Sequence, residues 1–148
     1  MDLAMEDISL HLLDIVENAL RAGAKNVVIR LAQSQREDRL ILEVTDDGEG
    51  MTEEDTRRSV DPFFTTKGGK RVGLGLPLLA QAAEEAGGTL EVQSAPGAGT
   101  KVIATFGLSH IDRRPLGDIA ETLKCLKATH PELGLRFESL DLDRSEAP

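Results

Sequence analysis

Three short groups of residues combine polar side chains with glycines in patterns that suit a small polar ligand. Asn18 lies in the segment Glu-Asn-Ala, within a predicted helix. Asp46 opens the segment Asp-Asp-Gly-Glu-Gly, which joins a hydrogen-bond acceptor to glycines that let a backbone approach a planar ligand. The run Gly73-Leu-Gly-Leu76 opens another predicted helix, where exposed amides can bind an anion such as phosphate. Together they predict a pocket for a planar ligand beside an anion site.

Each group also has an ordinary structural interpretation. His11, Asp14 and Asn18 fall at i, i+3 and i+7, so we expect them to share one helix face, opposite Ile8, Leu12, Ile15 and Ala19. Such a polar stripe is often only a solvated surface. Acidic glycine turns are common, and the Gly73 run lacks both the spacing of a Walker loop and the third glycine of a dinucleotide-binding fingerprint.

The elements that must position these residues alternate along the chain. Apolar spacing and Gly or Pro breaks predict helices over 7–21, 52–59, 76–86 and 115–129, and strands over 26–31, 40–45, 89–94, 100–106 and 133–140. Residues 61–73 are predicted to form a loop. The strands at 26–31 and 40–45 favour one hairpin, and those at 89–94 and 100–106 a second. We therefore expect a two-layer α/β sandwich: a mixed, mostly antiparallel sheet with helices on one face.

The length, charge and composition of the chain limit the classes of protein to which it can belong. The 148 residues suit one domain, which we divide into residues 1–108 and a helix–strand extension over 109–148. The net charge of −9 and 3% aromatic content argue against a nucleic-acid-binding surface. The composition, with one cysteine and no long apolar run, predicts a cytoplasmic protein without a membrane segment. Cys125 is expected to pack as a small apolar side chain.

Five motifs in order resemble those of the GHKL superfamily, which includes DNA gyrase, the large heat-shock chaperone, histidine kinases and MutL. The resemblance covers residues 8–106. The matching segments are Asn18 in Glu-Asn-Ala, Asp46 to Gly50, Asp61-Pro-Phe-Phe-Thr-Thr-Lys67, Gly73-Leu-Gly-Leu76 and Gly99-Thr100. The third and fourth segments resemble histidine kinases most. The resemblance implies the Bergerat ATP-binding fold, with ATP and Mg²⁺ as ligands.

The resemblance also implies a role for each matching residue. Asp46 would accept a hydrogen bond from the adenine amino group, and Thr100 would close the adenine side near it. Asn18 would ligate Mg²⁺. The residues implied beside the base are Gly48, Gly50 and Met51, and those implied near the phosphates are Arg21, Lys67, Gly73, Leu74, Gly75 and Leu76.

The resemblance also suggests a position for a catalytic base. In MutL and gyrase a glutamate four residues before the asparagine polarises water, and here that position is Asp14, one methylene shorter. A general base must come within about 3 Å of its water, so Asp14 is a candidate base or a residue behind the metal. Glu17 is less suitable, because it lies about 100° around the helix from Asn18.

Three functions agree with these motifs. We favour a stand-alone, kinase-type ATPase domain that phosphorylates or regulates a partner protein, because no phosphoaccepting histidine context or dimerising hairpin is found in the sequence. The alternatives are a non-catalytic nucleotide-sensing subunit of a larger, redox-associated complex and an anti-sigma-like serine kinase. The segment from Pro62 to Lys67 argues against the last of these.

Overall fold

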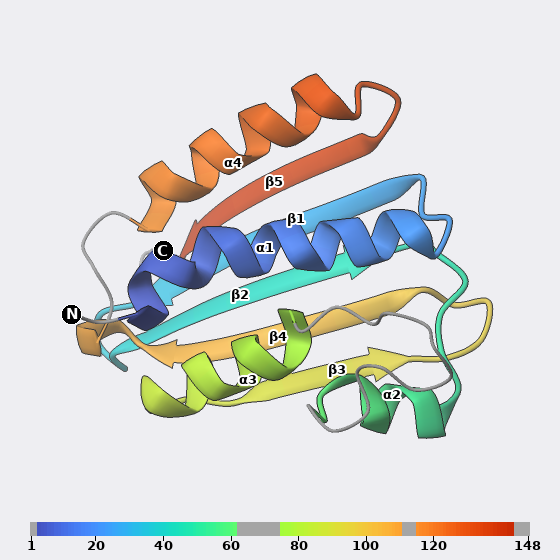
Figure 1. The fold of residues 1–148 in the computed structure, drawn as a ribbon. Helices are drawn as coiled ribbons and strands as arrows, with labels where there is room; N and C mark the ends of the chain where they lie inside the picture. The colour runs from blue at the N-terminus through green and yellow to red at the C-terminus, as the bar shows by residue number, and fades with distance from the viewer. Residues whose placement is uncertain (1–2, 62–74, 111–114, 144–148) are drawn as a thin grey trace.

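The computed structural model describes residues 3–61, 75–110 and 115–143 (Figure 1). Its elements follow the predicted order: α1 (Leu3–Arg21), β1 (Asn26–Ser34), β2 (Arg39–Asp46), α2 (Glu53–Ser59), α3 (Gly75–Glu85), β3 (Leu90–Ser94), β4 (Thr100–Gly107), the 3-10 turn η3 (Leu108–His110), α4 (Pro115–Thr129) and β5 (Gly134–Asp141). The predicted helices and strands are confirmed to within a few residues. The loop predicted over 61–73 lies almost wholly outside the described residues.

The five strands form one sheet in the order β3-β4-β2-β1-β5. β1 pairs with β2, β2 with β4 and β3 with β4, all antiparallel, which confirms both predicted hairpins. β5 pairs with β1 in parallel, so the sheet is mixed but mostly antiparallel. The sequence pattern had not determined this order, because pairing between distant strands leaves no local signal.

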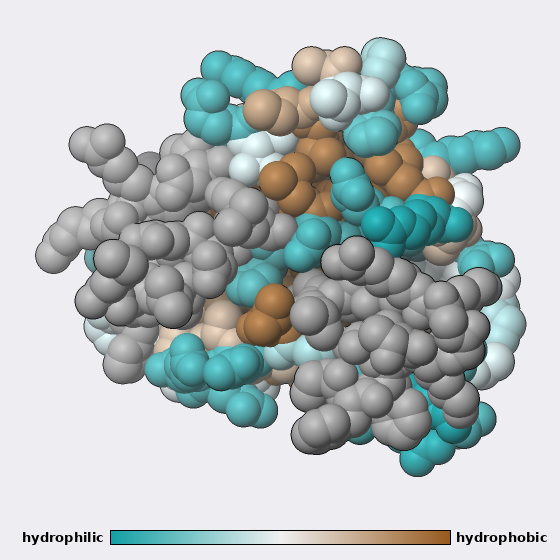
Figure 2. Space-filling view, viewed as in Figure 1, coloured by the Kyte–Doolittle hydropathy of each residue, from teal (hydrophilic) through white to brown (hydrophobic). Residues whose placement is uncertain are grey.

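The sheet has one covered face and one open face. Figure 1 shows α1, α3 and α4 on the same side of the sheet, and Figure 2 shows apolar residues gathered between α4 and α1. The core lies between these helices and the sheet and includes Leu12, Val16, Ile29, Leu42, Leu79, Phe106 and Ile119. The other face carries an ion-pair network in which Arg30 approaches Glu138 at 3.1 Å and Glu43 at 3.8 Å. The predicted two-layer sandwich is therefore confirmed.

The segment after β4 adds α4 and β5 to the sheet edge. The backbone N–H of Gly134 donates to the Lys25 carbonyl at 2.9 Å, beside the start of β1. Beyond β5, the Asp143 carboxylate accepts the Ser34 hydroxyl at 2.7 Å and the Gln35 amide at 2.8 Å, which lowers the pKa of Asp143. The extension is thus tied to both ends of β1, while its separation from residues 1–108 stays a prediction.

Two side chains lie differently from their predictions. Cys125 is exposed on α4, because Thr122 and Leu126 supply the buried face of this helix instead. His11 is only 5% exposed, so it does not belong to a solvated stripe with Asp14. Among the described helices, none is long and apolar enough to cross a membrane.

The two faces of the sheet give a direct test of this architecture. Val27 of β1 is fully buried under the helices, whereas its neighbour Val28 lies half-buried on the open face. Val27→Ala should lower the free energy of unfolding by about 2 to 3 kcal/mol. The same change at Val28 should lower it by about 1 kcal/mol or less. Urea denaturation followed by circular dichroism measures both, and equal losses would contradict the layer assignment.

Candidate functional site

Most of the described residues predicted to bind a ligand meet at one end of the sheet. A pocket of about 170 Å³ opens between the C-terminal half of α1, the end of β2 and the start of α3. We call it the Asp46 pocket. Of the predicted residues, those that line it are Asn18, Asp46, Gly50, Met51, Leu76 and Thr100. Lys67, Gly73 and Leu74 lie outside the described residues. The volume suits a single planar ring system better than a whole nucleotide, for which pockets of about 300 Å³ or more are usual.

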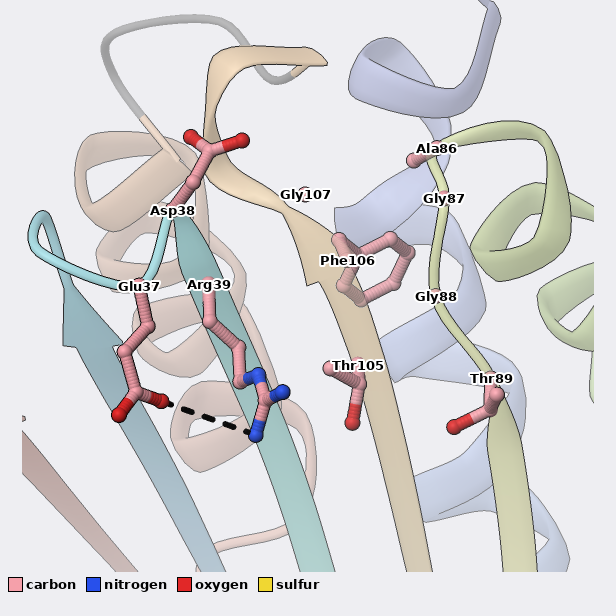
Figure 3. A pocket seen from close by; sticks show the side chains of 10 residues that line it. All are labelled: Glu37, Asp38, Arg39, Ala86, Gly87, Gly88, Thr89, Thr105, Phe106 and Gly107. Carbon is pink, nitrogen blue, oxygen red and sulfur yellow. Dashed lines mark ion pairs between the residues drawn. The ribbon is translucent and has the colours of Figure 1, made fainter.

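A larger hollow of about 450 Å³ lies at the opposite end of β2 (Figure 3). Its charged side chains are engaged with each other or with the chain: Arg39 approaches Glu37 at 3.9 Å. The Asp38 carboxylate accepts the Ser109 amide at 2.7 Å and the Ser109 hydroxyl at 2.8 Å. None of the predicted site residues lines it. We therefore place the candidate site in the Asp46 pocket, although it is the smaller of the two.

α1 supplies one wall of the Asp46 pocket. Asn18 is half-buried there beside the buried side chains of Ile15 and Ala19. The prediction that Asn18 and these apolar residues lie on opposite faces of the helix is therefore wrong, because Ile15 is only about 60° from Asn18 around the helix. Asp14 is exposed and is not among the residues that line the pocket.

Arg21 follows Asn18 by one turn and contacts it. Its guanidinium donates to Asn18 Oδ1 over 3.4 Å and approaches the Glu17 carboxylate at 3.9 Å. The Arg21 side chain is 64% exposed, so solvent screens these contacts and the side chain can move at little free-energy cost. Asn18, the residue predicted to ligate a metal, is half-buried and lines the pocket.

Asp46 provides the charged group of the pocket. Its carboxylate accepts the Gly48 amide at 2.8 Å and also a backbone hydrogen bond from Thr100. Burial raises the pKa of Asp46, the two backbone hydrogen bonds oppose this rise, and the negative charge of Asp47 adds to it. A half-buried carboxylate with unused lone pairs favours a ligand that brings N–H donors.

The loop after Asp46, residues 46–51, is held on both sides; we call it the glycine loop. The Glu49 amide donates to the Ala22 carbonyl at the end of α1, and the Glu49 carbonyl accepts the Gly97 amide at 2.7 Å. Gly50 has φ +74° and a Cβ there would lie 2.0 Å from the Ala95 carbonyl oxygen, so only glycine fits. At Gly48 a Cβ would lie 2.9 Å from the Ala22 carbonyl oxygen. These glycines are required by close packing of the chain itself.

Asp47 fastens the same loop to the start of β1. Its carboxylate accepts the Lys25 amide at 2.8 Å, the Asn26 amide at 2.9 Å and the Asn26 side-chain amide at 2.8 Å. These bonds, led by that from the Asn26 side chain, lower the pKa of Asp47 to about 2. The pKa values of the two adjacent aspartates are therefore shifted in opposite directions, because Asp46 is half-buried and Asp47 is exposed among N–H donors.

The shifted pKa of Asp47 makes its contribution to stability depend on pH. The folded state binds this proton more weakly than the unfolded chain, so ionised Asp47 stabilises the fold above the ordinary pKa of 3.8, and this contribution is lost as the pH falls towards about 2. Asp47→Asn should lower the melting temperature at pH 7, and its difference from the parent should shrink between pH 4 and about 2. Calorimetry across this range measures it.

Asp14→Asn is the matched control, because it removes the same charge from an exposed position on α1. A constant difference between Asp47→Asn and the parent down to pH 2 would contradict the hydrogen-bonded role of Asp47.

The fold is a two-layer α/β domain with a pocket lined by a carboxylate, Asp46, and a threonine, Thr100. Residues 6–110 match the family described as histidine kinase-, DNA gyrase B-, and HSP90-like ATPase. The chain belongs to this family. The resemblance found in the motifs is thereby confirmed, and the five-stranded mixed sheet agrees with the Bergerat fold.

Curated relatives and a solved structure agree with this family. The sensor histidine kinase YxdK of Bacillus subtilis is 35% identical over 97 residues, which are 62% of this chain and 30% of that protein. The sensor histidine kinase ZraS of Klebsiella oxytoca is 38% identical over 89 residues, 60% of this chain and 19% of that protein. The mycobacterial sensor histidine kinase MprB superposes with a TM-score of 0.52 at 26% identity, covering 65% of this chain and 66% of that one. The chain therefore represents an ATP-binding domain of the kinase type and spans less than a third of these two curated relatives.

Sequence reasoning missed several residues of the pocket. Ser94 contacts the glycine loop and Thr100 from the end of β3, and Ala22 and Ser59 line the pocket. Nothing in the local sequence around Ser94 distinguishes it from a serine before a turn. The β3–β4 hairpin was predicted, but its register, which places Ser94 beside Thr100, was not.

Proposed function

We propose that the chain binds ATP together with Mg²⁺ in the Asp46 pocket and acts as a kinase-type or ATP-driven regulatory module on a partner protein. The observation that carries the proposal is the half-buried Asp46 carboxylate, which faces an otherwise largely apolar pocket beside Thr100. An adenine ring fits such a pocket because its faces are apolar and its amino group donates hydrogen bonds. The family and its sensor histidine kinase members support the same ligand.

Each pocket residue has a proposed role in holding the nucleotide. Asp46 accepts from the adenine amino group, while Met51 and the glycine loop lie beside the ring. Thr100 closes the pocket next to Asp46. Leu76, buried at the start of α3, packs below the ring, and the first turn of α3 from Gly75 provides amides to the phosphates. Lys67, Gly73 and Leu74 are proposed to contact the phosphates as well.

Asn18 is the proposed protein ligand for Mg²⁺. An amide oxygen is a ligand that hard cations accept, and Mg²⁺ usually combines one or two protein oxygens with phosphate oxygens and water. Asn18 fits this pattern, because its side chain lines the pocket beside the residues proposed to hold the nucleotide. When bound, Mg²⁺ neutralises phosphate charge. Arg21 can move from Asn18 to the phosphates on nucleotide binding, since its present contact spans 3.4 Å.

Hydrolysis of ATP would need a general base close to the phosphates. Asp14 is exposed one helical turn before Asn18. We assign it as the candidate base for hydrolysis. A nucleotide-sensing subunit without catalysis is the second candidate. It is favoured by the hydrogen bonds that join the extension to the glycine loop, from Gly134 to Lys25 and from Lys25 to Asp47, through which a docked partner could act on the pocket.

Asp46→Asn should weaken ATP binding by about tenfold to a hundredfold, since a hydrogen bond to a charged acceptor contributes about 1.5 to 3 kcal/mol. The fold should remain intact. Because burial raises the pKa of Asp46, the folded state binds this proton more tightly than the unfolded chain does, so the ionised carboxylate lowers stability at pH 7 and removing its charge should keep or increase stability. Titration calorimetry with ATP and a melting curve at the same pH measure both quantities.

Asn18→Ala is the matched comparison for this prediction. It should remove the gain in affinity that Mg²⁺ provides and leave Mg²⁺-free binding of ATP nearly unchanged. Unaltered ATP affinity in Asp46→Asn would contradict the adenine role. Equal affinities of the parent with and without Mg²⁺ would contradict the metal role.

Incubation with Mg²⁺ and γ-labelled ATP, alone and with cell extract, tests the activity. We expect label on one extract protein, which would identify a kinase and its substrate. Free phosphate in the absence of extract, abolished in Asp14→Asn, would establish hydrolysis with Asp14 as the base. ATP binding with neither outcome would contradict the kinase proposal and favour the nucleotide sensor.

A further inference from the structure

Three polar side chains from adjacent strands form a row at the end of the sheet. Asp46 of β2 is the register partner of Thr100 of β4, and Thr100 is the register partner of Ser94 of β3. Asp46 and Thr100 alternate in step with the buried residues of their strands, and Ser94 with the half-buried Leu90 and Val92, so all three share the helix-covered face. Asp46 and Thr100 line the pocket, whereas Ser94 lies behind Thr100.

The Ser94 hydroxyl has three polar neighbours. Its oxygen lies 2.9 Å from the Met51 amide nitrogen, 2.8 Å from the Gly99 carbonyl oxygen and 2.9 Å from Thr100 Oγ1. An amide nitrogen can only donate and a carbonyl oxygen can only accept, so the first two bonds assign the Ser94 hydrogen to Gly99. The third bond must then use the hydrogen of Thr100. The alternative, in which Ser94 donates to Thr100, gives up the bond to the carbonyl of Gly99, a buried residue.

The direction of the Thr100 hydroxyl hydrogen determines whether this side chain offers a donor or an acceptor to a ligand. With its hydrogen directed at Ser94, Thr100 Oγ1 offers only lone pairs to the pocket. Ionised Asp46 also only accepts, and the Gly48 and Thr100 backbone amides beside it already donate to its carboxylate. The polar end of the pocket is therefore lined by acceptors.

We propose that Ser94 is a specificity-determining positioning residue: it holds the Thr100 hydroxyl as an acceptor, so that the pocket selects a purine with an exocyclic amino group. This inference rests on the proposed binding of ATP and extends it to the choice of base. A purine with a carbonyl group at that position, such as hypoxanthine, would place an acceptor against acceptors. Ser94 does not need to touch the ligand for this effect.

The test compares Mg²⁺-ATP with Mg²⁺-ITP, whose base has a carbonyl where adenine has the amino group. Dissociation constants are measured by calorimetry for the parent, Ser94→Ala, Thr100→Val and the double variant. We expect the parent to prefer ATP by about tenfold or more. In Ser94→Ala the Thr100 hydroxyl is free to rotate and donate to the carbonyl group, so the preference should fall by about fivefold to tenfold.

The double variant separates this role from a general structural one. In the Thr100→Val background there is no hydroxyl to orient, so Ser94→Ala should leave the ATP-to-ITP preference unchanged. Ser94→Thr, which keeps the hydroxyl, should retain the preference of the parent. Thr100→Val alone should reduce the preference for ATP over ITP. If Ser94→Ala does not fold, this variant tests whether the Thr100 hydroxyl sets the preference.

Two results would overturn the role of Ser94 while leaving ATP binding in place. One is an unchanged preference in Ser94→Ala. The other is an equal fall in preference when Ser94→Ala is added to Thr100→Val, which would mean that Ser94 acts by supporting Met51 and the glycine loop. A parent that binds neither nucleotide would instead remove the proposed function, and with it this inference.

Discussion

The register between β2 and β4 is the constraint on which the candidate site depends. It places Asp46 opposite Thr100, and the next pairing places Ser94 beside Thr100. Because side chains alternate along a strand, a shift of one residue would move a strand's polar group to the open face. Val44 and Val102, two positions along the same strands, are both buried, so such a shift would also expose the core. Packing of apolar side chains therefore determines where the polar site lies.

Asp46 and Asp47, the adjacent aspartates where β2 ends, have different roles in the candidate site. Asp47 is exposed, accepts three N–H groups and holds the glycine loop against the start of β1. Asp46 is half-buried and keeps lone pairs for a ligand, with a pKa raised by burial. A carboxylate of this kind lowers the stability of the empty domain and favours binding, because ligand donors compensate its lost hydration. At Asp46, ligand binding and the stability of the empty domain are therefore opposed. At Asp47 they are not, because its hydrogen bonds stabilise the fold and also hold the glycine loop in place.

The extension after β4 is physically connected to the site. β5 completes the sheet beside β1, and Gly134 donates to the carbonyl of Lys25, whose amide in turn donates to Asp47. These bonds join the sheet edge to the glycine loop over a few residues. A partner that contacts α4 or β5 would therefore act on a segment bonded to the pocket rim. These bonds are the physical basis of the regulatory role that we propose for the extension.

The sequence by itself determined the elements, the layer arrangement and most of the residues that meet in the pocket. Helical and strand periodicity are local signals, and the order of the motifs around Asn18, Asp46 and Leu76 was sufficient to indicate the family. Only the tertiary structure decided the strand order, the burial of His11 and the exposure of Cys125. It also set the register of the predicted β3–β4 hairpin, which brings Ser94 to Thr100, because register and the packing between helices depend on the whole fold.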